Sequence, residues 1–146
     1  MTQTLSDIAS RTDIERLVDG FYERVRGDAV LGPVFDDVAH TDWARHLPRM
    51  YDFWEGVLFG VTGFQGDPLA VHLALARRVP LGDREFGRWL DVFQETVGTL
   101  FHGPCADDVK ARASRIAAVM QHHLSRNAAP LRPSDVSPNV SKEAAL

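Results

Sequence analysis

Apolar residues recur every three or four positions along almost the whole chain, and this spacing restricts its regular structure to helices. The segment 46–58 is typical, with apolar or aromatic side chains and one histidine at i, i+4, i+7, i+8, i+11 and i+12. Such a stripe covers one face of an α-helix. No segment shows the convincing alternation with period two that a half-buried strand requires. The chain is therefore predicted to be all-α.

The spacing predicts four long helices and some short ones. The first follows a capping box, Thr12 with Glu15, and ends at Gly27. The second is expected to start near residue 46 or 47, because Pro48 is tolerated in a first turn, where its missing N–H costs nothing.

Further helices are separated by glycine and proline. Gly32 with Pro33 is expected to break the chain, whereas Asp67 with Pro68 is typical of an N-cap and first helical residue and opens a short helix. A long helix carries the stripe 86–101 and stops at Gly103 with Pro104. The last helix is expected from about 107 to 125.

The composition indicates one domain. A chain of 146 residues with 45% hydrophobic and 25% charged residues is an ordinary globular sequence. All 13 aromatic residues fall between Phe21 and Phe101, so the aromatic part of the core, or a binding site built from aromatic residues, is expected within that segment. The segment 127–146 carries three of the eight prolines and no aromatic residue. We expect a folded domain over 1–126 and a disordered tail over 127–146.

Several function classes are excluded by charge and residue counts. The single cysteine, Cys105, rules out an internal disulfide and a four-cysteine zinc site, and it favours the reducing cytoplasm. The polar N-terminus lacks the apolar run of a signal peptide, and no uncharged stretch approaches the length of a membrane span. A net charge of -4 without a long basic run does not fit a nucleic-acid-binding protein. We therefore expect neither membrane nor nucleic acid as a partner.

Four residues with polar heads stand on the apolar stripes of separate helices: Tyr22, His46, His72 and Trp89. A buried hydroxyl, imidazole or indole N–H costs about 1–3 kcal/mol when it lacks a partner, so these groups are expected to converge or to find local acceptors. Taken singly, each is more simply a core residue whose head reaches a backbone carbonyl or the surface.

His46 and His72, the two histidines on the apolar stripes, cannot complete a structural zinc site by themselves, because such a site needs four ligands. Haem requires only one axial imidazole from the protein, because the porphyrin provides four nitrogens. Its large apolar disc would also account for the crowding of aromatic residues. The residues therefore favour a haem pocket. A haem-free helical interaction module, with the aromatics as ordinary core, is the alternative.

Short motifs occur in a fixed order between Ile14 and Leu124. They are Phe21-Tyr22, Leu31-Gly32-Pro33-Val34-Phe35, Trp43 followed by His46-Leu47-Pro48, Asp52-Phe53-Trp54, Pro68 with His72-Leu73, and Arg88-Trp89-Leu90 with Phe93. In these motifs the chain resembles the third, or P-type, group of truncated haemoglobins. The double-glycine motifs of the other two groups are absent. The resemblance implies a truncated globin, a 2-over-2 helical sandwich around haem b (iron protoporphyrin IX).

The resemblance also implies a role for individual residues. His72 would be the proximal ligand of the iron, and Tyr22, His46 and Trp89 would form the distal side. The residues implied to contact the porphyrin are Phe35, Met50, Phe53, Leu69 and Phe93. The stretch from His72 to Trp89 is longer than is usual in the family, which leaves the loop near Arg77 and Arg78 unplaced.

By this resemblance the protein is expected to bind O2, CO and NO at a pentacoordinate, histidine-ligated iron. Two hydrogen-bond donors, Tyr22 and Trp89, would slow the escape of a bound ligand, which suits peroxidase-like or nitric oxide dioxygenase chemistry better than transport. A reductase is a candidate partner for such chemistry. The alternatives are a non-catalytic O2 sensor or store, and a bis-histidyl electron-transfer protein in which His46 also binds the iron.

Overall fold

The computed structural model describes residues 4–38, 40–61, 63–64, 66–78 and 81–126. The helices are α1 (Arg11–Gly27), α2 (Leu31–Pro33), the π-helix η1 (Val34–Val38), α3 (Trp43–Phe59), α4 (Pro68–Ala76), α5 (Asp83–Leu100) and α6 (Pro104–Arg126). The described ranges contain no strand, so the all-α prediction is confirmed. The predicted tail, 127–146, lies outside the described residues.

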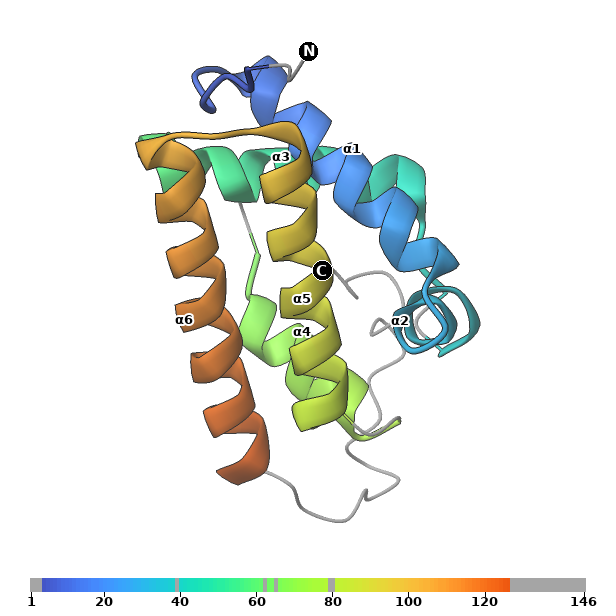
Figure 1. Ribbon diagram of the computed structural model, residues 1–146. Coiled ribbons are helices and arrows are strands. Elements are labelled where there is room, and N and C mark those ends of the chain that lie inside the picture. Colours follow the sequence, from blue (N-terminus) through green and yellow to red (C-terminus); the bar gives the residue numbers. More distant parts are fainter. Residues whose placement is uncertain (1–3, 39, 62, 65, 79–80, 127–146) are drawn as a thin grey trace.

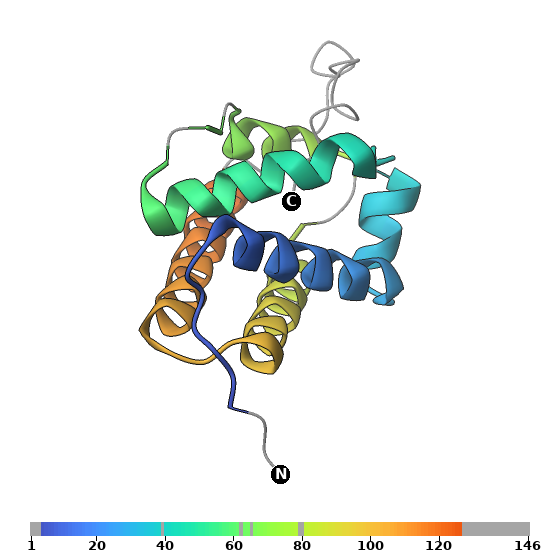
Figure 2. The ribbon, with the colours of Figure 1, turned by 90° about the horizontal axis from the view of Figure 1, so that it is seen from above.

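The long helices form two pairs. Helices α5 and α6 run side by side, and α1 and α3 lie across one end of that pair (Figure 1). Seen from above, α1 and α3 cross over α5 and α6, while α4 packs against α6 (Figure 2). No helix in the described ranges is both long and apolar enough to cross a bilayer.

Helix α1 buries the stripe that the periodicity predicts, from Ile14 to Val25. Its start differs from the prediction, because the N-cap is Ser10 rather than Thr12. The Ser10 hydroxyl accepts from the Asp13 backbone N–H (3.4 Å), and the Asp13 carboxylate accepts from the Ala9 N–H (2.8 Å). The capping-box prediction for Thr12 with Glu15 was therefore wrong, since these two residues already lie in the first turns of the helix.

Helix α3 also starts earlier than predicted, at Trp43, and Pro48 lies inside it. A proline at this position removes the hydrogen bond to the Ala44 carbonyl. Ala44 and Pro48 are both exposed, so water can hydrogen-bond to that carbonyl. The prediction that the helix starts near residue 46 or 47 was wrong for this reason. The helix ends at Gly60, which takes the left-handed conformation (φ 72°) that favours glycine at this position.

Gly32 and Pro33 do not break the chain as predicted, because they form α2, which continues into η1. The Asp28 carboxylate accepts from the Val30 and Leu31 N–H groups (both 3.0 Å) and from the Arg88 side chain (2.6 Å), which fastens this segment to α5. A Cβ at residue 32 would lie 2.8 Å from the Arg26 carbonyl oxygen, so glycine permits this close approach.

The prediction for α4 is confirmed, since the Asp67 side chain accepts from the Ala70 N–H and Pro68 is the first helical residue.

Helix α6 begins at Pro104, earlier than the predicted 107. The Asp7 carboxylate caps it by accepting from the N–H groups of Cys105 (2.9 Å) and Ala106 (2.8 Å). Asp7 lies almost a hundred positions before the start of α6, so no local sequence pattern predicts this cap.

Stacked rings at the centre join three helices. Trp54 of α3 stacks on Phe93 of α5 (ring centroids 4.7 Å apart), and Phe93 stacks on Trp89 (5.4 Å). Phe21 of α1 meets Phe93 and Trp89 edge-on, at 5.2 and 5.7 Å. Such pairs stabilise beyond their buried area, and here they hold Trp89 in a fixed place.

We predict that Asp7→Ala lowers the free energy of unfolding by about 1–2 kcal/mol, because two partly buried N–H groups of α6 lose their acceptor. Urea unfolding measures this. Asp108→Ala is the control, because its ion pair with Arg112 is exposed, and it should change stability by less than about 0.5 kcal/mol. Equal losses in the two variants would contradict the assignment of the Asp7 cap.

The Asp7 contribution should also depend on pH. Burial raises the pKa of Asp7, but the N–H groups of Cys105, Ala106 and Ile8, together with His102, lower it more, so the folded pKa lies below the ordinary 3.8. A carboxyl with a depressed folded pKa stabilises fully above its unfolded pKa and loses this effect as pH falls through the folded value. The difference between wild type and Asp7→Ala should therefore be constant near neutrality and shrink below about pH 4.

Candidate functional site

His72 is held by its own helix. Its Nδ1–H donates to the Pro68 carbonyl oxygen, one turn back in α4 (2.5 Å), which fixes the tautomer and leaves Nε2 with its lone pair. The ring is buried, and burial lowers its pKa despite the opposing effect of the Pro68 carbonyl, so it is neutral at pH 7. A neutral imidazole with a free Nε2 is a metal ligand.

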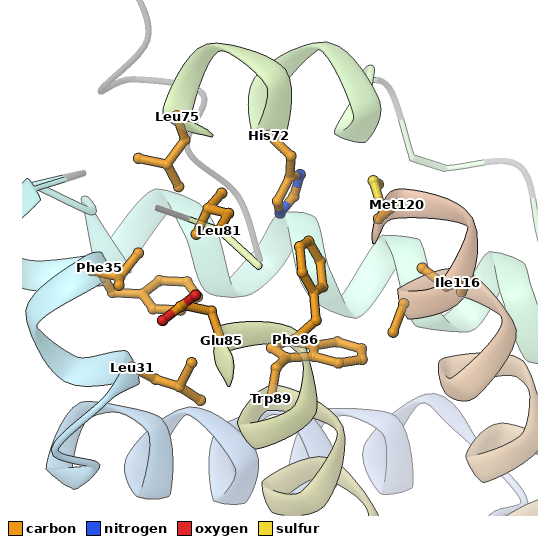
Figure 3. A pocket seen from close by; sticks show the side chains of 12 residues that line it. Leu31, Phe35, His72, Leu75, Leu81, Glu85, Phe86, Trp89, Ile116 and Met120 are labelled. Carbon is orange, nitrogen blue, oxygen red and sulfur yellow. The ribbon is translucent and has the colours of Figure 1, made fainter. Parts of the chain in front are cut away.

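The His72 ring points into a pocket between α4, α5 and α6 (Figure 3). The pocket is lined by Leu31, Val34, Phe35, His72, Leu75, Leu81, Glu85, Phe86, Trp89, Ile116, Ala117 and Met120. The space among these side chains is about 520 Å³, and this figure includes space that is open to solvent. Its walls are almost entirely apolar.

A cluster of four rings adjoins this pocket at Phe35. Tyr22 of α1 lies against His46 (ring centroids 4.8 Å) and Trp43 (5.3 Å) of α3, and against Phe35 of η1 (5.9 Å). His46 also meets Phe35 at 6.3 Å. The structure thus brings the predicted residues Tyr22 and His46 together, next to the wall that Phe35 and Trp89 share.

Polar atoms in this region are buried without hydrogen-bond partners in the described structure. They are the Tyr22 hydroxyl, both ring nitrogens of His46, and the Trp89 indole nitrogen. Each costs about 1–3 kcal/mol, and native proteins rarely keep such atoms without a reason. Three of the four predicted polar-head residues therefore have no local acceptor. Tyr22 and His46 lie together against Phe35, and Trp89 lines the same pocket as Phe35, which is an arrangement expected when a ligand supplies the missing bonds.

The ionisation of these groups follows from their burial. Burial, with the charges of Arg49 and His72, lowers the pKa of His46 to about 3. Burial also raises the pKa of Tyr22 well above its ordinary value. At neutral pH both groups are uncharged, so Tyr22 can donate one hydrogen bond, and His46 can donate one and accept one.

The other residues predicted to contact a cofactor lie in different surroundings. Phe35 lines the pocket, whereas Met50 and Phe93 are fully buried in the core and Phe53 packs on Trp54 and Phe64. The side chain of Leu69 lies outside the described residues. The contacts of Met50, Phe53, Leu69 and Phe93 with a cofactor stay predictions.

The structure adds pocket residues that were not assigned to the site. Ile116, Ala117 and Met120 come from α6, and their inward spacing was the available signal. Glu85 is the acidic residue in the lining, and its carboxylate accepts from the Gly82 N–H at the start of α5 (2.9 Å).

The candidate site is thus an apolar pocket in a small helical protein, with one oriented imidazole and a cluster of unpartnered polar groups. No family model matches the chain. The chain is 32% identical to the Group 3 truncated hemoglobin of Campylobacter jejuni over 118 residues, which covers 79% of this chain and 91% of that protein. The crystal structure of the group III truncated hemoglobin from Campylobacter jejuni superposes with a TM-score of 0.73 at 30% identity. It covers 83% of this chain and 95% of its own.

Identity at this level over most of both chains establishes the class of protein, a globin. The chain belongs to the group III truncated haemoglobins.

We predict that Tyr22→Phe raises the free energy of unfolding of the chain without added ligand by about 1 kcal/mol, because it removes a buried hydroxyl that has no partner. Tyr51→Phe is the matched control. Its hydroxyl donates to Asp19 near the surface, so its removal should leave stability unchanged or lower it. Urea unfolding compares the two, and a clear loss of stability in Tyr22→Phe would show that the hydroxyl has a protein partner.

Proposed function

We propose that this protein is a haem-binding globin in which His72 ligates the iron of haem b and the opposite side takes O2, CO and NO. The observation that carries the proposal is the set of buried, unpartnered polar atoms on Tyr22, His46 and Trp89 beside the His72 pocket. If stability of the fold were the only requirement, these polar groups would be paired with protein acceptors or replaced by apolar ones.

The donor set fits a haem. One buried imidazole is oriented through its Nδ1–H and keeps Nε2 for a metal, as in haem proteins with a proximal histidine. The apolar lining suits a porphyrin face, and no cluster of three His, Cys, Asp or Glu side chains in the described ranges offers a metal site of its own. The haem would supply an iron with one open coordination position.

The distal residues would act as hydrogen-bond donors to a small ligand in the pocket. The Tyr22 hydroxyl and the Trp89 indole each carry one unused N–H or O–H, and neutral His46 carries another. A hydrogen bond that is lost when the ligand leaves slows escape about tenfold for each ~1.4 kcal/mol. Two or three such bonds in a dry site would therefore give slow release.

Slow release supports a reactive role over transport. Donors aimed at a developing negative charge stabilise it in a site that excludes water, so Tyr22 and Trp89 would favour peroxidase-like or nitric oxide dioxygenase chemistry, with a reductase as the partner that returns electrons. A non-catalytic sensor or store uses the same pocket and differs only in lacking turnover of peroxide or nitric oxide.

We predict that the haem-loaded protein shows a Soret band and that His72→Ala abolishes or strongly weakens it. His122→Ala is the matched control, because that residue is exposed on α6 and should leave the spectrum unchanged. Ferric, ferrous and CO-bound spectra are recorded for each variant. An unchanged Soret band in His72→Ala would overturn the ligand assignment, and a six-coordinate ferrous spectrum before CO is added would favour the bis-histidyl alternative.

We also predict that Tyr22→Phe and Trp89→Phe each speed O2 dissociation about tenfold, because each removes a donor worth ~1.4 kcal/mol. Stopped-flow mixing with CO or a reductant measures the rate. Tyr51→Phe is the control, since its hydroxyl faces Asp19, and it should dissociate O2 at the wild-type rate. Wild-type rates in both distal variants would contradict the donor roles.

A further inference from the structure

Trp43 connects the buried ring cluster with the surface. Its ring lies 5.3 Å from that of Tyr22 and 5.5 Å from that of His46, and it stacks on Phe35 at 5.8 Å. The other three rings are almost fully buried, with 2%, 4% and 9% of their surface exposed, whereas Trp43 is half-buried. Within this cluster Trp43 is therefore the ring that reaches outward.

The outer side of Trp43 is built from charged groups. Its Nε1–H donates to the Asp36 carboxylate (3.0 Å), and the Arg26 guanidinium lies 4.9 Å above the ring and 3.7 Å from the other Asp36 oxygen. Unlike the indole of Trp89, this indole already has a proton acceptor.

A groove between α1 and α3 opens beside Trp43. Its lining includes Tyr22 on the inner side and Asp19, Glu23, Arg26 and Tyr51, and it holds about 890 Å³ of space that is open to solvent. Two carboxylates against one guanidinium give these walls a net negative charge. A cationic electron donor is the kind of molecule that such a groove attracts.

We propose that Trp43 is an electron relay that carries reducing equivalents from a cationic one-electron donor in the α1–α3 groove to the distal pocket. The inference rests on the proposed haem function, because hydrogen peroxide reacting in the pocket is the oxidant that draws the electrons.

The relay step balances in electrons and protons. After hydrogen peroxide has reacted in the distal pocket, Trp43 gives one electron to that site. At the same time the Trp43 Nε1 proton moves to the Asp36 carboxylate. The donor then returns one electron, and the proton returns from Asp36 to Nε1. Two such cycles, with two protons from solvent, reduce one peroxide to two water molecules.

The neighbouring aromatic residues are less suited to this role. Tyr22 contacts the same rings, but its hydroxyl has no acceptor for the proton that an oxidised phenol must lose. Tyr51 has an acceptor in Asp19, yet among the described ring contacts none joins it to Tyr22 or His46. Trp43 combines a proton acceptor with direct contact to the distal rings. The Arg26 charge above its ring disfavours a cationic radical, so electron and proton should leave together.

The test uses the haem-loaded full chain with hydrogen peroxide and two readouts. A nitroso spin trap, followed by peptide mapping with mass spectrometry, locates protein radicals. Ferrocytochrome c, a cationic donor too large to enter the interior, reports electron delivery from the surface. Wild type should carry the adduct on Trp43, and Trp43→Phe should lose it and oxidise ferrocytochrome c about tenfold more slowly, while the change in the Soret band with peroxide keeps its wild-type rate.

Two further variants separate a relay from a structural role. Asp36→Asn keeps an oxygen that accepts from Trp43 but cannot take up its proton, so the adduct should shrink without loss of fold. His122→Ala, the control on α6 outside the groove, should leave both readouts unchanged. A wild-type Soret band that does not respond to peroxide would overturn the proposed peroxide chemistry and the relay with it. A normal response with no adduct on Trp43, or with unchanged electron delivery in Trp43→Phe, would overturn the relay alone.

Discussion

The structure depends on a balance between ring packing and unpartnered polar atoms. The stack of Trp54, Phe93 and Trp89, with Phe21 against its edge, buries large apolar surfaces at about 25 cal/mol for each Å². That burial offsets the cost of keeping the polar atoms of Tyr22, His46 and Trp89 without partners. The same stack holds Trp89 rigid, so the cost of preorganising the site is met by folding rather than by ligand binding.

The ring cluster of Tyr22, Phe35, Trp43 and His46 has two sides with different chemistry. On its buried side it holds the unpartnered polar atoms of Tyr22 and His46, where a hydrogen bond to a small ligand would be strong. Toward the groove it ends in Trp43, whose proton acceptor and neighbouring charges are in reach of solvent. Under the proposed function, ligand binding and electron delivery would thus be separated in space within one small domain.

The helices could be predicted because each apolar stripe is a local pattern in the sequence. The resemblance to truncated haemoglobins could also be recognised from the sequence, because it rests on short local motifs. The helix boundaries were less predictable. The caps at Ser10 and at α6 use partners outside the predicted capping patterns, and Asp7 acts across nearly the whole chain length. The pair Gly32 with Pro33 has the composition of a break, but the contacts of Asp28 with Arg88 and with two backbone N–H groups hold it as a turn of helix. That turn leads into η1, which carries Phe35 to the pocket.

The amino-acid sequence determined which polar heads would stand on buried faces, since side-chain direction follows from a position's place in a helical repeat. It could not determine whether those heads would find acceptors. Only the packing of α1, α3 and α5 decided that Tyr22, His46 and Trp89 remain unpartnered. The tertiary structure also placed Met50 and Phe93 in the core and brought Trp43 between the distal rings and the surface. These outcomes depend on how helices cross, and crossing is fixed by contacts between residues far apart in the chain.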